Sequence, residues 1–344
     1  MSPGGPAARP AVMVDVARLA GVSHQTVSRV LNGHANVRPE TRERVLDAIR
    51  RLDYHPNTSA RALVTRRART IGVVSFDTRL YGPASTLLAI ERAARAEGYA
   101  VTLISIPTVD RDSVRTAVRS LAGQAADGVI VIAPREHATH GLGDLRPGLP
   151  VVAVEAGYEG DAPVVSVDQP AGARLATEHL LALGHETVWH VAGPTDWLEA
   201  RERVEGWRAA LDDAGRAAAP ILRGDWSPQS GYEAGLELVG KPRLTAVFAA
   251  NDQMALGVMH ALHERGVRVP EDVSVVGFDN IPESAYLTPS LTTVHQDFDE
   301  VGRRGLRLLI DIMDGDPEQV TIPDRVPAVL VPRRSSAPPS PRAS

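Results

Sequence analysis

Apolar and polar positions near the start of the chain follow three successive helical patterns. The first predicts a helix over residues 13–20 that ends at Gly21, and the second predicts a helix that begins after Ser23. Ser23 is a favourable N-cap, and Pro39 suits the first turn of a third helix. The apolar positions expected to face inward are Val16, Leu19, Ala20, Val27, Val30, Leu31, Val45, Ile49 and Leu52. Three short helices with a glycine turn between the first two are typical of a helix-turn-helix.

From residue 70 onward, short β-branched runs alternate with helical patterns. The runs are TIGVVS, AVTLISI, GVIVIA, VVAVEA, VWHVAG, TAVFAA and VSVVGF. The helical patterns lie near residues 84–97, 112–124, 171–183, 199–213, 229–239, 252–265 and 298–314. Such alternation is typical of βαβ units with helices on both faces of a parallel sheet. Because residues 70–334 are too many for one such sheet, we expect an α/β body of two lobes with a cleft.

Charge separates the head from the body. Residues 1–70 contain 12 Arg and 5 acidic residues, a balance of +7, and the rest contains 25 basic and 37 acidic residues, a balance of −12. A basic head on an acidic body indicates that the head meets a polyanion. The second helix of a helix-turn-helix enters the DNA major groove with its N-terminal residues on base edges. The head therefore predicts binding to double-stranded DNA.

The exposed face of the second helix carries groups that suit DNA. The side chains suited to base edges are His24, Gln25 and Arg29, and those suited to phosphates are Thr26, Ser28 and Asn32. An ordinary amphipathic helix with a solvated face is the alternative, but the turn glycine, the cap and the charge balance all favour DNA binding. The basic segment HPNTSARALVTRRART, residues 55–70, follows the head and is too short to hold a helix alone. It is either a plain linker or a hinge that becomes helical when two copies pack on DNA.

The segments VDVARLAGVSHQTVSRVLNG, RPETRERVLDAIRRLDYHPN and ARAL resemble the LacI family of bacterial transcription regulators. The resemblance runs from about residue 12 to about residue 334. It implies a homodimer on a palindromic operator, with Ala60 and Leu63 of paired hinge helices in the minor groove and Leu63 wedged between base steps. Val12 and Arg38 depart from the family, since they stand where capping Thr and Ser are common. Each departure loosens a helix start by about 1 kcal/mol.

The resemblance, together with the Pro-, Ala- and Ser-rich composition of both ends, implies a domain organisation. The expected parts are a disordered N-terminus (1–11), a helix-turn-helix domain (12–57), a hinge (58–69), an effector-binding and dimerisation body (70–334) and a disordered tail (335–344). The lobes of the body are expected at about 70–167 with 297–325, and 168–296 with 326–334. The tail SSAPPSPRAS has no heptad pattern, which favours a dimer over a tetramer.

Polar residues stand at the ends of the predicted strands, where ligands of parallel sheets bind. These residues are Asp77, Glu155, Asn251 with Asp252, and Asp279 with Asn280. Carboxylates and amides suit a polyhydroxyl ligand, because each pairs with neighbouring hydroxyls. Arg203 adds a fork of donors, and Trp226 offers a flat face to a sugar ring. Any one of these residues alone is more simply a turn residue or a helix cap, but together they favour a saccharide over a nucleobase.

The body segments RERVEGW, GDWSPQSGY, FAANDQMALG, SVVGFDN and LTTVHQDF are similar to those of galactoside-responsive LacI-family members. The resemblance implies a type I periplasmic-binding-protein fold in which the chain crosses between the lobes three times. It places the effector contacts at Glu155, Arg203, Trp226, Asn251, Asp279, Gln296 and Phe298. Glu155 and Val167 differ from the shorter Asp and the aromatic residue found there, which changes the outline of the pocket. A galactoside or a β-glucoside such as cellobiose is therefore the expected inducer.

Other functions receive less support. The chain has no GxGxxG after the first strand, no Walker A motif and no GxSxG, and carboxylates at strand ends fit binding as well as glycoside hydrolysis. We therefore expect no enzyme activity and no cofactor. The pairs His137/His140 and His260/His263 lack a third ligand, so no metal site is expected. A purine-responsive regulator with its ligand as co-repressor is the main alternative, but 4% aromatic residues supply few stacking partners.

The expected location is the cytoplasm. The chain has no cysteine, no secretory signal and no apolar run long enough to span a bilayer. A periplasmic sugar-binding protein would share the body, but it would need a signal and would not carry a basic head.

Overall fold

The computed structural model describes residues 11–31, 36–54, 68–76, 79–108, 110–132, 149–155, 162–315 and 324–340. The chain divides into two compact units, 1–68 and 69–344, which are described separately below. The predicted hinge and the predicted disordered N-terminus fall almost wholly outside the described residues. Asn32, Ala60, Leu63, Asp77, His137 and His140 lie outside them as well.

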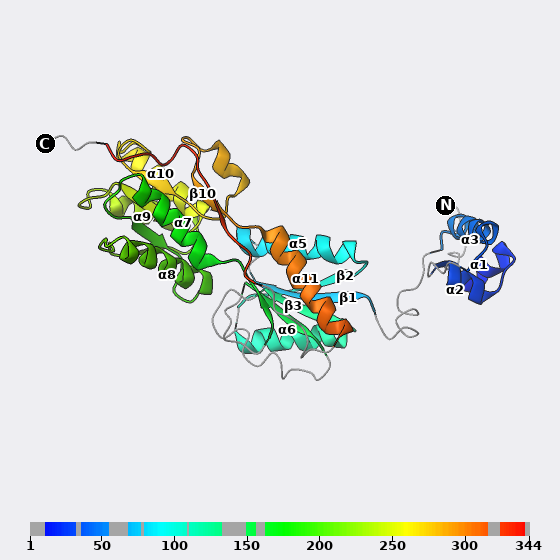
Figure 1. Cartoon of the computed structure of the whole chain (residues 1–344). Helices are drawn as coiled ribbons and strands as arrows, with labels where there is room; N and C mark the ends of the chain where they lie inside the picture. The colour runs from blue at the N-terminus through cyan, green and yellow to red at the C-terminus, as the bar shows by residue number, and fades with distance from the viewer. Residues whose placement is uncertain are drawn as a thin grey trace, which may run out of the picture. The chain divides into compact units, whose positions relative to one another are not determined.

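The head consists of the three predicted helices, α1 (Met13–Ala20), α2 (His24–Leu31) and α3 (Pro39–Arg51) (Figure 1). Their buried core is Val16, Ala17, Ala20, Val27, Val30, Val45, Ala48 and Tyr54. The prediction that Leu19 faces inward is wrong, because its side chain is 43% exposed. At about 100° per residue, the buried stripe of α1 runs from Val16 through Ala20 to Ala17, and Leu19 lies about 60° outside it.

The helix starts of the head follow the predicted capping pattern. The backbone amide of Thr26 donates to Ser23 Oγ over 3.2 Å, which confirms Ser23 as a cap. Neither Val12 nor Arg38 makes a side-chain cap, as their residue types predict. In α1 the backbone amide of Val12 donates to the Asp15 carboxylate over 3.0 Å. Asp15 therefore offsets part of the missing cap at the start of α1.

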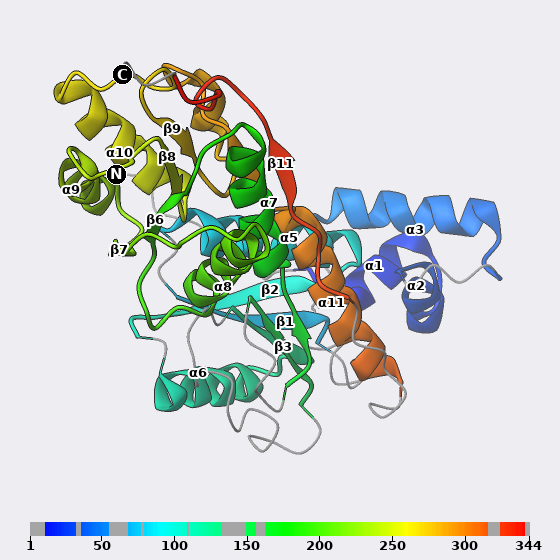
Figure 2. The same cartoon turned by 60° about the vertical axis from the view of Figure 1, so that its left-hand side comes forward.

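The first lobe of the body is built on a parallel sheet of order β2-β1-β3-β4-β5. Its strands are β1 (Thr70–Phe76), β2 (Ala100–Ile106), β3 (Gly128–Ile132), β4 (Val151–Val154) and β5 (Val164–Val165). Helix α6 (Arg111–Gly123) covers one face, and α5 (Tyr81–Ala96) and α11 (Phe298–Asp314) cover the other (Figure 2). Strands β3 and β4 are buried on both faces, which explains their unbroken β-branched runs.

The second lobe is built on a parallel sheet of order β7-β6-β8-β9. Its strands are β6 (Trp189–Ala192), β7 (Leu222–Arg223), β8 (Ala246–Ala249) and β9 (Ser274–Val276). Helices α7 (Gln169–Ala182) and α8 (Leu198–Asp213) share one core, and α9 (Pro228–Leu238) and α10 (Asp252–Glu264) share the other. A short 3-10 helix, η1 (Pro282–Tyr286), follows β9. The predicted helices and strands of both lobes are confirmed.

The chain passes between the lobes three times: after β5, after β10 (Thr293–His295) and before β11 (Val329–Val331). Strands β10 and β11 pair antiparallel, and a bridge between Val167 and Val326 joins two of the crossings. The crossings bring Gln169 and Gln296 into direct contact, with the Gln169 amide donating to Gln296 Oε1 over 2.7 Å. The start of α7 and the segment before α11 are therefore linked at the boundary between the lobes.

The prediction of a disordered tail from residue 335 is wrong for residues 335–340, which pack on the second lobe. Ser335 is fully buried, and its hydroxyl donates to the Val275 carbonyl over 2.6 Å. The amide of Val275 donates in turn to the Ser335 carbonyl, and Ser336 Oγ lies 2.8 Å from His179 Nε2. Serine hydroxyls and backbone pairing fix this segment, although its composition resembles a disordered tail.

No helix within the described ranges is long and apolar enough to cross a membrane.

Candidate functional site

The face of α2 presents the predicted DNA-contacting side chains in two groups. His24, Gln25 and Arg29 are exposed, as base-reading side chains must be. Thr26 and Ser28 are half-buried, and Thr26 Oγ1 lies 2.9 Å from Ser23 Oγ. The three side chains predicted to read bases are therefore more exposed than the two predicted to contact phosphates.

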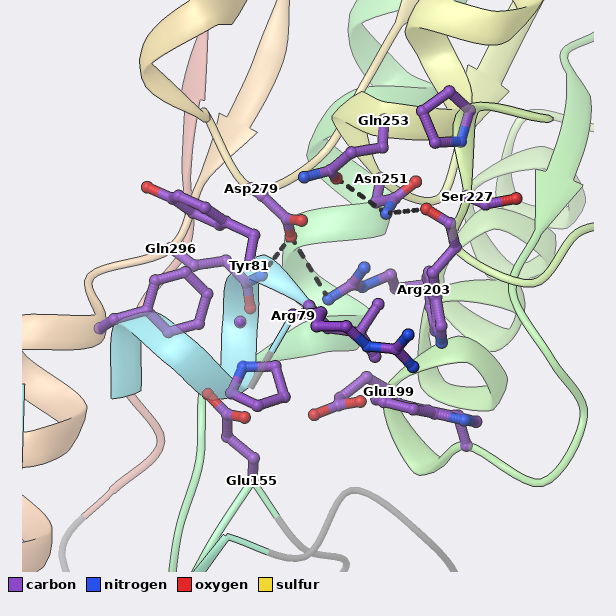
Figure 3. Close-up of a pocket in the computed structure, with 17 residues that line it drawn as sticks. Arg79, Tyr81, Glu155, Glu199, Arg203, Ser227, Asn251, Gln253, Asp279 and Gln296 are labelled. Carbon is purple, nitrogen blue, oxygen red and sulfur yellow. Dashed lines mark hydrogen bonds and ion pairs between the residues drawn. The ribbon is translucent and has the colours of Figure 1, made fainter. Parts of the chain in front are cut away.

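A pocket of about 250 Å³ lies between the two lobes (Figure 3). The first lobe contributes the start of α5 and the end of β4, and the second lobe contributes the starts of α8, α9 and α10. All seven predicted effector residues line it: Glu155, Arg203, Trp226, Asn251, Asp279, Gln296 and Phe298. The lining residues that were not predicted are Arg79, Leu80, Tyr81, Gly82, Pro83, Trp197, Glu199, Ser227, Pro228 and Gln253.

Arg203 occupies the middle of the pocket wall and is only 4% exposed. Its Nε donates to Gln169 Oε1 over 2.8 Å and its Nη1 donates to the Ala250 carbonyl over 2.5 Å. The guanidinium carbon lies 4.0 Å from the centre of the Phe278 ring. A guanidinium has five N–H groups, so three of them make no hydrogen bond within the described residues. They are charged donors that this pocket offers to a ligand.

A chain of amides connects Arg203 with Asp279. Gln169 accepts from Arg203 and donates to Gln296, and Gln296 Nε2 donates to Asp279 Oδ1 over 2.6 Å. Asp279 Oδ1 also lies 3.9 Å from Arg203 Nη2. The four side chains are nine-tenths or more buried, so their hydrogen bonds fix the carboxylate and the guanidinium in one orientation. Gln169 does not line the pocket, and it acts as a support for two residues that do.

Three lining residues adopt a left-handed backbone conformation that side chains rarely occupy. The φ angles are 58° at Glu155, 75° at Trp226 and 108° at Asp279. Such conformations cost about 1–3 kcal/mol each, and they cluster at binding and catalytic sites. Gly193 makes room for the Trp226 ring, because a Cβ there would lie 2.3 Å from it. The unfavourable backbone conformation at these three positions therefore directs their side chains into the pocket.

The other strand-end residues have structural roles. Asn251 caps α10 by accepting from the Met254 amide over 2.9 Å, and its Nδ2 donates to the Trp226 carbonyl. Asp252 is fully buried and accepts from Thr293 Oγ1 over 2.6 Å, away from the pocket lining. Asn280 accepts from Arg333 Nη2 over 2.6 Å. Asn251 therefore both lines the pocket and caps a helix, whereas Asp252 and Asn280 hold the loop beside it.

Burial sets the ionisation of the pocket carboxyls. It raises the pKa of Glu155 to about 7, against the opposing effects of Thr86 and Arg203. Burial likewise raises the pKa of Asp279 to about 6, although Arg203 and Gln296 favour its charged form. The pKa of Glu199 is raised well above its usual value by burial and by repulsion from Glu155. The pocket therefore carries acceptors whose charge depends on what they bind.

The expectation of a cleft poor in aromatic side chains is wrong. Four of the lining residues are aromatic: Tyr81, Trp197, Trp226 and Phe298. They come from the first turns of α5 and α11 and from the residues just before α8 and α9, which meet at the pocket. The Trp197 and Trp226 rings meet at 69° with centroids 5.4 Å apart, and the Tyr81 and Phe298 rings meet at 74° with centroids 5.8 Å apart. The overall composition gave no information about this local concentration.

One of the missed residues carried a sequence signal. Glu199 and Arg203 are four residues apart in a predicted helix, so they lie on the same face. Arg79 and Tyr81 gave no comparable signal, since only the fold brings the start of α5 opposite α8. No group of three or more metal-ligating side chains occurs in the part of the chain that the structure describes, and His260 Nε2 there lies 3.5 Å from Glu264.

Two protein-family models match the chain. The model described as bacterial regulatory proteins of the lacI family matches residues 12–57, and that of a periplasmic binding protein-like domain matches residues 177–336. The lactose operon repressor of Escherichia coli is 33% identical over 97% of this chain and 94% of its own length. The repressor PurR of Haemophilus influenzae is 34% identical over 88% of this chain and 90% of its own length.

Solved structures are similar over nearly the whole chain. The lac repressor dimer bound to operator and the anti-inducer ONPF has a TM-score of 0.85 at 33% identity and covers 96% of this chain and 100% of its own. The complex of the transcriptional regulator CelR with cellobiose has a TM-score of 0.68 at 32% identity. The match covers 95% of this chain and 100% of the CelR chain. These relatives are regulators and not enzymes, and the resemblance of the motifs to the lactose repressor extends to the whole fold. The chain belongs to the LacI family of bacterial regulatory proteins.

Proposed function

We propose that the protein is a saccharide-responsive transcriptional repressor that binds a palindromic operator as a homodimer. A saccharide in the interlobe pocket acts as the inducer and releases the operator. The observation that carries the proposal is the pocket itself. It combines three unbonded N–H groups of Arg203 with buried carboxylates and indole faces. Paired hydroxyls and the apolar face of a sugar ring match both kinds of group.

Two relatives support the saccharide. One is the lactose operon repressor, and the other is CelR, whose structure contains cellobiose. The seven predicted effector residues lie together on one pocket, as a single bound sugar requires. A galactoside or a β-glucoside is therefore the proposed inducer. The ligand acts through its higher affinity for the lobe arrangement that does not grip the operator.

A purine is the second candidate, because PurR is equally similar in sequence and four aromatic residues line the pocket. A flat base binds best between parallel rings or against one open face. The two aromatic pairs of this pocket meet instead at 69° and 74°, so neither forms a slot for a base. The ring arrangement therefore supports a saccharide more than a purine.

A thermal-shift screen tests the choice of ligand. Lactose, cellobiose and their monosaccharides are compared with hypoxanthine and guanine on the full-length protein. A saccharide present at 100 times its Kd is expected to stabilise the protein by about 2.7 kcal/mol and to weaken operator binding. Stabilisation by a purine alone, together with tighter DNA binding, would replace the inducer model with a co-repressor model.

The proposed DNA contacts are the side chains of α2 together with Asn32 and the hinge residues Ala60 and Leu63. Because Arg29 is exposed on α2, we propose that it reads a base edge in the major groove. Arg29→Ala is expected to cost about 1–3 kcal/mol at the operator and to relax the preference at one base position. The measurement is fluorescence anisotropy with operator variants and with random DNA. Equal losses on both would show that Arg29 contacts phosphate only.

A further inference from the structure

Glu199 is a pocket carboxylate that receives no hydrogen bond from the described residues. It lies in the first turn of α8, its residue is 9% exposed, and it lines the pocket. No hydrogen bond or ion pair reaches its carboxylate from the described residues, in contrast to Glu155, which accepts from Thr86 Oγ1 over 2.5 Å. In Figure 3 the Glu199 carboxylate points into the cavity. A largely buried carboxylate that opens only into a pocket and has no donor there suits a hydroxyl donor on the ligand.

Negative charge surrounds this carboxylate on several sides. Glu155 at the end of β4 repels it, and Glu202 on α8 and Asp279 after β9 add to the repulsion. Arg203, one turn further along α8, favours its charged form. Arg203 is already shared with Gln169, Ala250 and Asp279. Arg79 also lines the pocket, so the lining contains three carboxyls and two guanidinium groups.

We propose that Glu199, together with Glu155, forms an acceptor subsite that takes hydroxyl hydrogens of a neutral saccharide and rejects phosphorylated and carboxylate-bearing sugars. The inference rests on the proposed function and narrows the ligand class within it. Hydroxyls donate to both carboxylates without adding charge. A phosphate or carboxylate at this end of the pocket meets two carboxyl groups, and the charge of Arg203 is already shared with Asp279 at 3.9 Å. Loss of hydration and repulsion by the ionised carboxylates therefore disfavour such a ligand.

The same geometry links effector binding to protons. Without ligand, burial and repulsion from Glu155 raise the pKa of Glu199, which favours its neutral form. Hydroxyl donors stabilise the charged form and therefore lower this pKa on binding. A group whose pKa falls on binding releases a proton, so the affinity for the sugar rises with pH from the usual carboxyl range up to the raised pKa. Glu155, with a pKa of about 7, contributes in the same direction.

Isothermal titration calorimetry with lactose and cellobiose tests the subsite on the full-length protein. The matched anionic probes are lactobionic and cellobionic acid and the 6-phosphates of both sugars. At least one neutral sugar is expected to bind, and its anionic counterparts are expected to bind at least 100-fold more weakly. Titration in buffers of different ionisation enthalpy is expected to show proton release, with affinity increasing between pH 6 and pH 8.

Glu199→Gln keeps the shape of the side chain and removes the charge. It is expected to lower the affinity for the neutral sugar at least tenfold and to reduce proton release on binding. The difference in affinity between neutral and anionic sugars should also become smaller. Glu205→Gln is the control, since Glu205 is exposed on the same helix and does not line the pocket. Circular dichroism and the thermal midpoint check folding, and a Glu199→Asp variant keeps the charge if Glu199→Gln does not fold.

Three outcomes would overturn the inference. If Glu199→Gln binds the neutral sugar as the unmutated protein does, Glu199 is not a ligand contact. If anionic sugars bind as tightly as neutral ones, the subsite does not select by charge. Both results leave saccharide-responsive repression intact. If no saccharide binds and purines do, the proposed function and this inference fail together.

Discussion

Replacing Arg203 by alanine is expected to give a repressor that binds its operator but no longer responds to saccharide. The variant removes the three N–H groups that are available to the ligand, and each hydrogen bond to a charged group contributes about 1.5–3 kcal/mol. Because about 1.4 kcal/mol is a factor of ten, sugar affinity should fall by at least tenfold. Operator binding without sugar should stay near that of the unmutated protein, since Arg203 belongs to the body and the base-reading side chains belong to the head.

The same variant should also lower the stability of the body. Arg203 is the cation that favours the charged form of buried Asp279, and its loss raises the pKa of this carboxyl further above 6. Asp279 then takes up a proton at neutral pH, which limits the loss to part of the roughly 3–5 kcal/mol typical of breaking a buried ion pair. Because the pKa of Asp279 in the folded protein lies above its usual value, stability falls as pH rises through this range, and in the variant the fall should extend to higher pH than in the unmutated protein.

Fluorescence anisotropy of labelled operator, with and without saccharide, measures the response, and thermal unfolding measures the stability. Arg208→Ala is a matched control, because Arg208 is exposed on the same helix and does not line the pocket. It should leave the sugar response and the thermal midpoint nearly unchanged. Normal sugar binding by Arg203→Ala, or loss of operator binding in the absence of sugar, would show that the pocket assignment is wrong.

The elements of the body could be predicted from sequence because their patterns are long and regular. The runs that became β1, β3 and β8 are buried on both faces, and such strands need apolar residues throughout. Strands β5, β7, β10 and β11 were not predicted, since they are two or three residues long and show no period. Their pairing comes from neighbouring strands and from the crossing segments.

The candidate site was predictable where chemistry coincides with a strand end. Glu155 and Asp279 follow strands, and their unusual backbone angles aim them into the pocket. The support from Gln169 was not predictable, because its partners Arg203 and Gln296 are 34 and 127 residues away in the chain. The aromatic side chains Tyr81 and Trp197 were not predicted as lining residues for a similar reason, since they reach the pocket only when the two lobes are assembled.

Gly257→Ala is expected to destabilise the body strongly and to disturb the pocket wall. Helices α9 and α10 pack closely through glycines, and a Cβ on Gly257 would lie 2.0 Å from the Pro228 carbonyl oxygen. Gly231 has the same constraint, because a Cβ there would lie 2.2 Å from the Met254 carbonyl oxygen. Backbone atoms cannot turn aside as a flexible side chain does, so the helices must separate. Overpacking typically lowers the free energy of unfolding by about 1–3 kcal/mol. Because the clash here is with backbone atoms, the loss for this variant should lie at the upper end of that range or above it.

The effect should reach the ligand, because Ser227 and Asn251 stand at the N-termini of these two helices and line the pocket. Thermal unfolding and saccharide titration of Gly257→Ala are compared with Gly123→Ala, where an added Cβ meets nothing within 4 Å. Gly123→Ala should be neutral or up to about 1 kcal/mol stabilising, since alanine loses less backbone freedom on folding. A thermal midpoint and a sugar affinity for Gly257→Ala equal to those of Gly123→Ala would show that α9 and α10 can move apart without cost. The close packing of α9 and α10 would then not hold this pocket wall in place.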